Sequence, residues 1–125
     1  MRIIVVGVCT SGKTTLVRFL SGLGIDAYNV AQEHSCIKKL WKKKQPDILV
    51  MLDATMPAIR RRREVSWGEE RLVVQHERLR DAREHADLYI QTDDLTRQEV
   101  AQIVLTSIRR KQNANDYSRR FENRP

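Results

Sequence analysis

The sequence predicts an α/β domain in which helices cover both faces of a short parallel sheet of four strands. Apolar runs that suit buried strands alternate with stretches of helical periodicity, and this alternation is typical of a parallel sheet. A glycine-rich segment joins the first apolar run to the first helical stretch. A chain of 125 residues, of which 41% are hydrophobic, provides one compact core and not two.

A first strand is expected over 2–7, because its four central residues are β-branched and apolar, as in a strand buried on both faces of a sheet. The first helix should span 13–21. Its apolar stripe consists of Leu16, Val17, Phe19 and Leu20. Gly22 and Gly24 end this helix, and a second strand follows over 25–30.

A short helix is expected over 35–44, because three apolar residues share one face and the lysines share the other. The apolar residues are Ile37, Leu40 and Trp41. Pro46 ends this helix. The third buried strand should cover 47–53, and Pro57 suits the first turn of the helix after it.

Two capping boxes, each a Ser or Thr with a Glu three residues later, predict where two further helices begin. Ser66 and Glu69 form the first box, which opens a helix that ends near His85. Thr96 and Glu99 form the second box, which opens the last helix.

The fourth strand is expected over 87–91, before the last helix. The apolar face of that helix consists of Val100, Ile103, Val104 and Ile108. We therefore expect one domain over 1–108 and a basic polar tail over 109–125, which should be loose from Lys111 onward.

Basic residues outnumber acidic ones, so the formal net charge is +7. The excess gathers in 38–44, in 60–63 and after 107, which favours anionic partners such as nucleotides, phosphorylated metabolites or nucleic acid. A solvated basic surface is the alternative for each cluster. The two cysteines lack metal-ligand spacing, and neither a signal peptide nor a membrane span is visible, so we expect a reduced, cytoplasmic protein without membrane contact.

The loop between the first strand and the first helix carries the most specific motif. Its sequence, G-V-C-T-S-G-K-T, matches G-x-x-x-x-G-K-[ST], and a strand before it and a helix after it are the context that the motif requires. Glycine lets the backbone wrap an anion closely, so that the amide groups point into one concavity at the positive end of a helix dipole. The expected nucleotide-binding residues are Gly7, Val8, Cys9, Thr10, Ser11, Gly12, Lys13, Thr14 and Thr15.

Individual side chains of this loop have different expected roles. Lys13 should reach the β- and γ-phosphates, Thr14 should supply a hydroxyl to Mg²⁺, and Thr15 should bond an α-phosphate oxygen. Cys9 is expected to fill space in the loop rather than to act as a nucleophile.

With this loop, the chain resembles the small P-loop kinases, the group of shikimate kinase, adenylate kinase and thymidylate kinase. The resemblance rests on the loop and helix over 3–20, on P-D-I-L-V-M-L-D-A-T over 46–55 with the basic helix after it, and on A-D-L-Y-I-Q-T-D over 86–93 with the helix after it. It implies a three-layer P-loop NTPase fold, bound ATP with Mg²⁺, and lid arginines that touch the phosphates. Among the four consecutive arginines, Arg63 is the expected catalytic one.

One part of the kinase pattern is missing. In that group, a long segment after the second strand holds the acceptor-binding helices and a further strand, whereas only residues 30–45 lie here. The lid is reduced to about 63–68. Without the further strand, the expected sheet order is 2-1-3-4. A third strand inserted between the first and second would instead support Asp53 as a metal-binding acid.

Candidate acids follow the second and third strands. Asp53 ends the run I-L-V-M-L-D, which is the form of a strand whose carboxylate serves Mg²⁺, although Asp also caps turns at strand ends. Glu33 and His34 follow the second strand, and the carboxyl ends of parallel strands face the ligand crevice. Glu33 is thus a candidate base or outer metal ligand and His34 a candidate acceptor contact; alternatively, Glu33 and Ser35 only open the short helix.

The residues together favour an ATP-dependent phosphotransferase in which Lys13, Glu33 and Arg63 act on the γ-phosphoryl group and pass it to a small anionic or polar acceptor. The sequence has no guanine-specifying N-K-x-D motif, so ATP is preferred to GTP by default only. One alternative is an NTPase or regulatory switch without a dedicated acceptor. A second alternative is a nucleic-acid-associated protein that uses the basic helices and tail.

Overall fold

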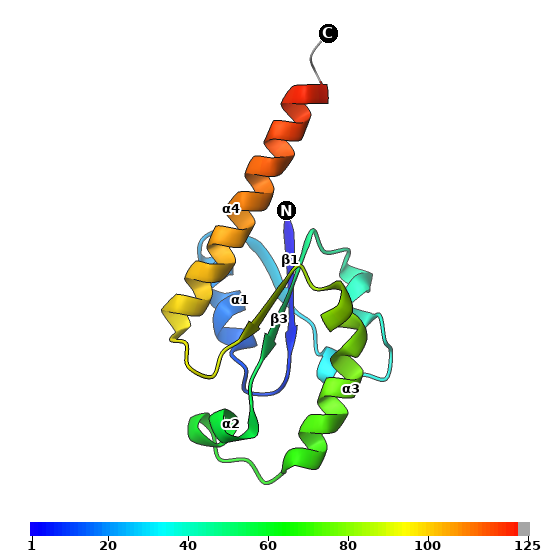
Figure 1. The fold of residues 1–125 in the computed structure, drawn as a ribbon, viewed down its shortest axis with the longest axis vertical. Helices are drawn as coiled ribbons and strands as arrows, with labels where there is room; N and C mark the ends of the chain where they lie inside the picture. The colour runs from blue at the N-terminus through cyan, green and yellow to red at the C-terminus, as the bar shows by residue number, and fades with distance from the viewer. Residues whose placement is uncertain (123–125) are drawn as a thin grey trace.

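The structure, a computed structural model, describes the backbone of residues 1–122 and the side chains of residues 1–116. Four parallel strands form one sheet in the order β2-β1-β3-β4, and their arrows point to the same end of the molecule (Figure 1). Two short 3₁₀ helices, η1 and η2, lie between β2 and β3. The elements are β1 (Arg2–Gly7), α1 (Lys13–Gly22), β2 (Asp26–Asn29), η1 (Gln32–His34), η2 (Leu40–Lys44), β3 (Ile48–Asp53), α2 (Met56–Arg62), α3 (Glu69–His85), β4 (Leu88–Gln91) and α4 (Arg97–Glu122).

The predicted strands and their order are confirmed. β1 and β3 are the central strands, and their register pairs Ile3 with Ile48 and Gly7 with Leu52. Positions 3–6 of β1 are fully buried, because a central strand of a parallel sheet is covered on both faces. The edge strands β2 and β4 are more exposed and correspondingly more polar.

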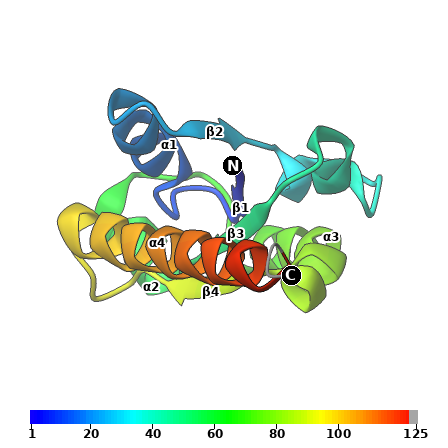
Figure 2. The same cartoon turned by 90° about the horizontal axis from the view of Figure 1, so that it is seen from above.

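Alternate residues of the strands enter two separate cores, one on each face of the sheet. Ile3 and Val5 of β1 pack with residues of α1 and α4. Ile4 and Val6 pack with residues of α2, α3 and η2 on the opposite face. Figure 2 shows α1 and α3 on opposite sides of the sheet. Because the four strands are parallel, their carboxyl ends lie at one edge of the sheet, where the glycine loop also lies.

The helix predicted over 35–44 is wrong. Only Leu40–Lys44 is helical, as the 3₁₀ helix η2, and Ile37 is exposed. In an α-helix, the N–H of Trp41 would donate to the carbonyl of Ile37. The buried side chain of Gln32 takes both groups instead: its Nε2 donates to Ile37 O at 2.7 Å, and its Oε1 accepts from Trp41 N at 3.0 Å. A side chain from outside the segment thus replaces the helical hydrogen bond.

The capping predictions had different outcomes. Glu99 N donates to Thr96 Oγ1 at 3.1 Å and Thr96 N donates to Glu99 Oε1 at 2.9 Å, which confirms the capping box of α4. The box predicted at Ser66 is wrong, because Gly68 is the N-cap of α3 and no side chain caps it. Ser66 lies two residues before this N-cap, in the loop between α2 and α3.

The tail predicted to be loose from Lys111 is helical as far as Glu122, because α4 continues through it. The segment 109–124 contains neither glycine nor proline, so nothing in its sequence ends the helix. Residues 123–125 of the predicted tail lie outside the described residues. The far part of α4 projects beyond the amino ends of the strands (Figure 1). Within the described part of the chain, no helix is long and apolar enough to cross a membrane.

Candidate functional site

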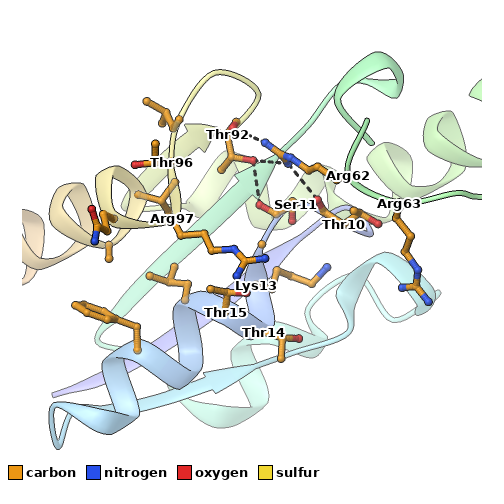
Figure 3. Close-up of a pocket in the computed structure, with 17 residues that line it drawn as sticks. Thr10, Ser11, Lys13, Thr14, Thr15, Arg62, Arg63, Thr92, Thr96 and Arg97 are labelled. Atoms are coloured by element: carbon orange, nitrogen blue, oxygen red, sulfur yellow. Dashed lines mark hydrogen bonds between the residues drawn. The ribbon is translucent and has the colours of Figure 1, made fainter. Parts of the chain in front are cut away.

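A cavity of about 630 Å³ opens at the carboxyl edge of the sheet. Its volume is in the range of small-molecule sites. Three segments form it: the glycine loop with α1, the end of α2, and the loop from β4 into α4. Figure 3 shows these side chains around one hollow. The lining residues are Thr10, Ser11, Gly12, Lys13, Thr14, Thr15, Leu16, Phe19, Arg62, Arg63, Thr92, Leu95, Thr96, Arg97, Gln98, Val100 and Ala101.

Two glycines of the loop are required by its geometry. A Cβ atom at Gly7 would lie 2.1 Å from the carbonyl oxygen of Leu52 in β3, so the loop could not leave β1 along this path with any other residue. Gly12 has φ +106°, a conformation that residues with a Cβ atom rarely adopt. The bend at Gly12 places the loop at the N-terminus of α1, where the helix dipole favours an anion.

The structure brings Lys13 and Glu33 together. Lys13 Nζ donates to the carbonyls of Gly7 at 2.7 Å and Val8 at 2.9 Å, and to Glu33 Oε2 at 2.5 Å. Both side chains are buried. Among the described side chains, Glu33 Oε1 and Ser11 Oγ are buried without a hydrogen-bond partner. A buried carboxylate oxygen without a partner is costly, so this corner of the loop is suited to receive a further polar or charged group.

The arginines differ in how they are held. Arg62 Nη1 donates to Thr10 O at 3.1 Å and to Thr92 Oγ1 at 3.0 Å, and its Nη2 donates to Thr92 O. Arg62 thus links α2 with the glycine loop and with the segment after β4. Arg63, the predicted catalytic arginine, lines the cavity with an exposed side chain. In Figure 3, Arg97 reaches from the start of α4 toward Lys13 and Thr15.

Asp53 is held by a different set of residues. Its Oδ1 accepts from Ala54 N at 2.9 Å and lies 2.8 Å from His76 Nε2, and its Oδ2 accepts from Tyr89 OH at 2.6 Å. Burial, then the hydrogen bond to Asp53 and the charge of that carboxylate, raise the pKa of Tyr89 to about 12. Asp53 is outside the set of described residues that line the cavity, whereas Thr14, its predicted partner in metal binding, is within it.

Helix α3 contacts both the glycine loop and η1 through hydrogen bonds. Cys9 N donates to Gln75 Oε1 at 2.9 Å, and Arg78 Nη1 donates to Glu33 O at 3.3 Å. His34 lies beside Cys9 and outside the cavity lining. These contacts join residues far apart in the sequence.

Sequence reasoning identified the loop but missed several lining residues. Thr92 and Arg97 belong to the cavity wall and carry no motif of their own. Thr96 was expected only as a helix cap, and Arg62 lies in the run of arginines from which Arg63 was the expected catalytic residue. The one available signal was position: Thr92 directly follows β4, as Glu33 follows β2, and the carboxyl ends of parallel strands share an edge.

Comparison with known proteins assigns the chain to no family. No protein-family model matches the sequence, and no curated protein matches it significantly. The functional interpretation therefore depends on the arrangement of these side chains.

Proposed function

We propose that this chain binds Mg-ATP in the cavity at the glycine loop and transfers the γ-phosphoryl group to a small polar or anionic acceptor, as a small P-loop kinase. One observation supports this most strongly: a loop that matches G-x-x-x-x-G-K-[ST] without a mismatch lines a cavity whose lining also includes Arg62, Arg63 and Arg97. A triphosphate carries several negative charges, and this cavity offers backbone amides, a lysine and guanidinium groups.

The cavity lining combines two kinds of residues that suit the two parts of a nucleotide. Residues 10–15, at the start of α1, suit the phosphates. The lining also includes the apolar side chains of Phe19, Leu95, Val100 and Ala101, which suit a base and a ribose.

Of the two residues predicted to hold Mg²⁺, Thr14 lies in the cavity and Asp53 does not. The Thr14 hydroxyl lines the cavity and is the residue type that holds Mg²⁺ after a loop lysine. Both oxygens of Asp53 already have partners on the protein, so its contribution would run through water. When bound with ATP, the ion would neutralise charge on the phosphates.

The Lys13–Glu33 pair provides the chemistry for phosphoryl transfer. A bound triphosphate would offer Lys13 phosphate oxygens in place of Glu33, so the lysine would turn from the carboxylate to the β- and γ-phosphates. The carboxylate of Glu33 would then be able to accept the proton of the acceptor hydroxyl. Arg63 would stabilise the negative charge on the transferring group.

Calorimetric titration with Mg-ATP tests the binding proposal. Lys13→Ala should weaken binding at least tenfold. Because this change leaves Glu33 buried without its partner, the double variant Lys13→Ala, Glu33→Gln removes both charges and keeps a foldable protein for the same titration. Lys43→Ala, at an exposed position outside the cavity, is the matched control and should bind as the unchanged chain does. Equal affinities for the control and the double variant would exclude the loop as the binding site.

A second candidate function is an NTPase or regulatory switch without a dedicated acceptor. It is favoured by the segment between β2 and β3, which contains only η1, η2 and their connections and forms no separate acceptor domain. Incubation with γ-labelled ATP, Mg²⁺ and a panel of metabolites distinguishes the two functions. A labelled metabolite supports the kinase, whereas labelled inorganic phosphate as the sole product supports the NTPase.

A further inference from the structure

Three side chains with metal-binding atoms meet behind the glycine loop: Cys9, Glu33 and His34. Cys9 belongs to the loop after β1, and the other two belong to η1 after β2. Cys9 Sγ lies 3.4 Å from His34 Nε2, and the ligand atoms of all three side chains lie within 4.8 Å of one another. The adjacent strands β1 and β2 bring these atoms together, although residues 9 and 33 are far apart in the sequence.

A second observation indicates that this cluster lacks a partner. Glu33 is 3% exposed, and its Oε1 has no hydrogen-bond partner among the described residues. Its other oxygen, Oε2, accepts from Lys13. A buried carboxylate oxygen normally has a donor or a cation beside it. Oε1 is therefore available for a ligand that does not displace Lys13.

The donor set selects the kind of ion. A thiolate and an imidazole suit Zn²⁺, whereas Mg²⁺ prefers oxygen ligands alone. Tetrahedral zinc with bonds of about 2.0–2.3 Å places its ligand atoms roughly 3.3–3.8 Å apart. The separation of 3.4 Å between the sulfur of Cys9 and the ring nitrogen of His34 agrees with this geometry.

We propose that Cys9, Glu33 and His34 form a binding site for Zn²⁺ with three protein ligands and an open fourth position. Three protein ligands with a fourth position for water or substrate are typical of reactive zinc sites and not of closed structural ones. The site shares Glu33 with the phosphoryl transfer proposed above, but none of its three residues lines the cavity, so it can be tested with the metal alone. His34 is exposed and Cys9 is half-buried, so an ion can reach the site from solvent.

Neighbouring groups hold the first of these ligands in place. Gln75 of α3 bonds Cys9 twice: its Oε1 accepts from the backbone N–H, and its Nε2 donates to the sulfur at 3.4 Å. A donor to the sulfur favours the thiolate that a zinc ion requires.

Cobalt titration tests this site, because Co²⁺ replaces Zn²⁺ and reports its ligands by absorption. The full chain, stripped with a chelator, should bind one equivalent of Co²⁺. It should then show a sulfur-to-cobalt charge-transfer band together with the intense visible bands of a four-coordinate ion, and added Zn²⁺ should remove both. Cys9→Ser should abolish the charge-transfer band, and His34→Ala should weaken binding about 100-fold or more.

Matched controls use the other cysteine and another exposed histidine. Cys36→Ser and His85→Ala should leave the spectrum and the affinity unchanged, because both residues lie outside the cluster. Far-ultraviolet circular dichroism checks that Cys9→Ser and His34→Ala are folded, and the side chain of His34 is exposed. A chain without the charge-transfer band, or one that loses the band on Cys36→Ser, would overturn the proposal.

Discussion

Glu33 combines three features that bear on its role. It is buried, it holds the ammonium group of Lys13, and it follows an edge strand at the carboxyl side of the sheet. Its replacement by Gln keeps the size and the acceptor for Lys13 but removes the charge. This substitution therefore separates a chemical role of the carboxylate from a structural one.

Under the proposed kinase function, Glu33→Gln should lower ATP turnover by about 100-fold while the affinity for Mg-ATP changes little, because a general base acts mainly in the transition state. Turnover assays and calorimetry on the same preparation measure both quantities. Glu77→Gln, an exposed change on α3, is the control. Unchanged turnover would contradict the role of Glu33 as base and favour the switch.

Tyr89 provides a pH-dependent contribution to stability. Its pKa is raised to about 12 by burial and by Asp53, against an ordinary value of 10. The folded chain therefore holds the phenolic proton more tightly than the unfolded chain. The stabilisation is fully present below pH 10 and is lost as the pH rises from about 10 to 12.

The variant Tyr89→Phe has no proton to lose, so its stability should fall less steeply than that of the unchanged chain over this pH interval. Urea unfolding at several pH values between 8 and 12 gives the two curves. Parallel curves for the two chains would show that the hydrogen bond from Tyr89 to Asp53 does not contribute.

For single residues, the sequence predicts the position of those that belong to one local motif. Lys13 and Thr14 could be placed because the loop motif fixes both their neighbours and their direction. Glu33 could be placed near them because strand ends converge. The partners of Asp53 could not be predicted, because His76 and Tyr89 come from elements whose packing against β3 depends on the whole fold.

Among the helices, α4 has the most complete cap. Thr96→Ala removes the hydroxyl that accepts from Glu99 N, and it should lower the free energy of unfolding by about 1 kcal/mol. Thr106→Ala, in the interior of the same helix, should change the free energy of unfolding by less than about 0.5 kcal/mol. Urea unfolding of the two variants compares them, and equal effects would mean that the cap does not stabilise α4.

Element prediction failed where a side chain from just outside the segment replaced a helical hydrogen bond within it. The segment 35–44 has helical periodicity, yet the amide of Gln32 occupies the backbone groups of Ile37 and Trp41. Trp41 is then fixed against α3 by a hydrogen bond from its Nε1 to Asp81 at 2.9 Å. Hydrophobic periodicity shows which face of a segment is apolar. It does not show whether a side chain will compete for the backbone groups of that segment.

For the whole molecule, the sheet order was predictable and the extent of α4 was not. The order follows from the short connection between β2 and β3, which leaves no room for another strand. The continuation of α4 depends on the absence of a stop signal, whereas the polar composition of the tail favoured a loose segment. The three-layer P-loop identity of the fold stays a prediction.

The projecting part of α4 should contribute little to stability. Ile108 is the last core residue of α4 among the described side chains, and Lys111 donates to the carbonyl of Asp47. A chain that ends at Lys111 should therefore unfold within about 0.5 kcal/mol of the full chain. A chain that ends at Ser107 loses the burial of Ile108 and should be less stable by about 2 kcal/mol.

Thermal and urea unfolding of these two shortened chains measure the difference. A large loss of stability in the longer chain would mean that residues 112–125 pack on the domain.

Anisotropy titrations with an oligonucleotide at several salt concentrations, on the same chains, test whether the basic tail binds nucleic acid.

The strand order also determines how this chain reaches its fold. β1 is made first but lies in the middle of the sheet, and its partners are distant: Arg2 pairs with Asp26, and Ile3 pairs with Ile48. No two strands form a hairpin, so every ladder closes only after a long stretch of chain has been ordered. Topologies dominated by such non-local pairs fold slowly, on the order of milliseconds to seconds. The first strand, apolar at four consecutive positions, therefore stays exposed until β3 arrives, and this interval is when the chain is most open to aggregation.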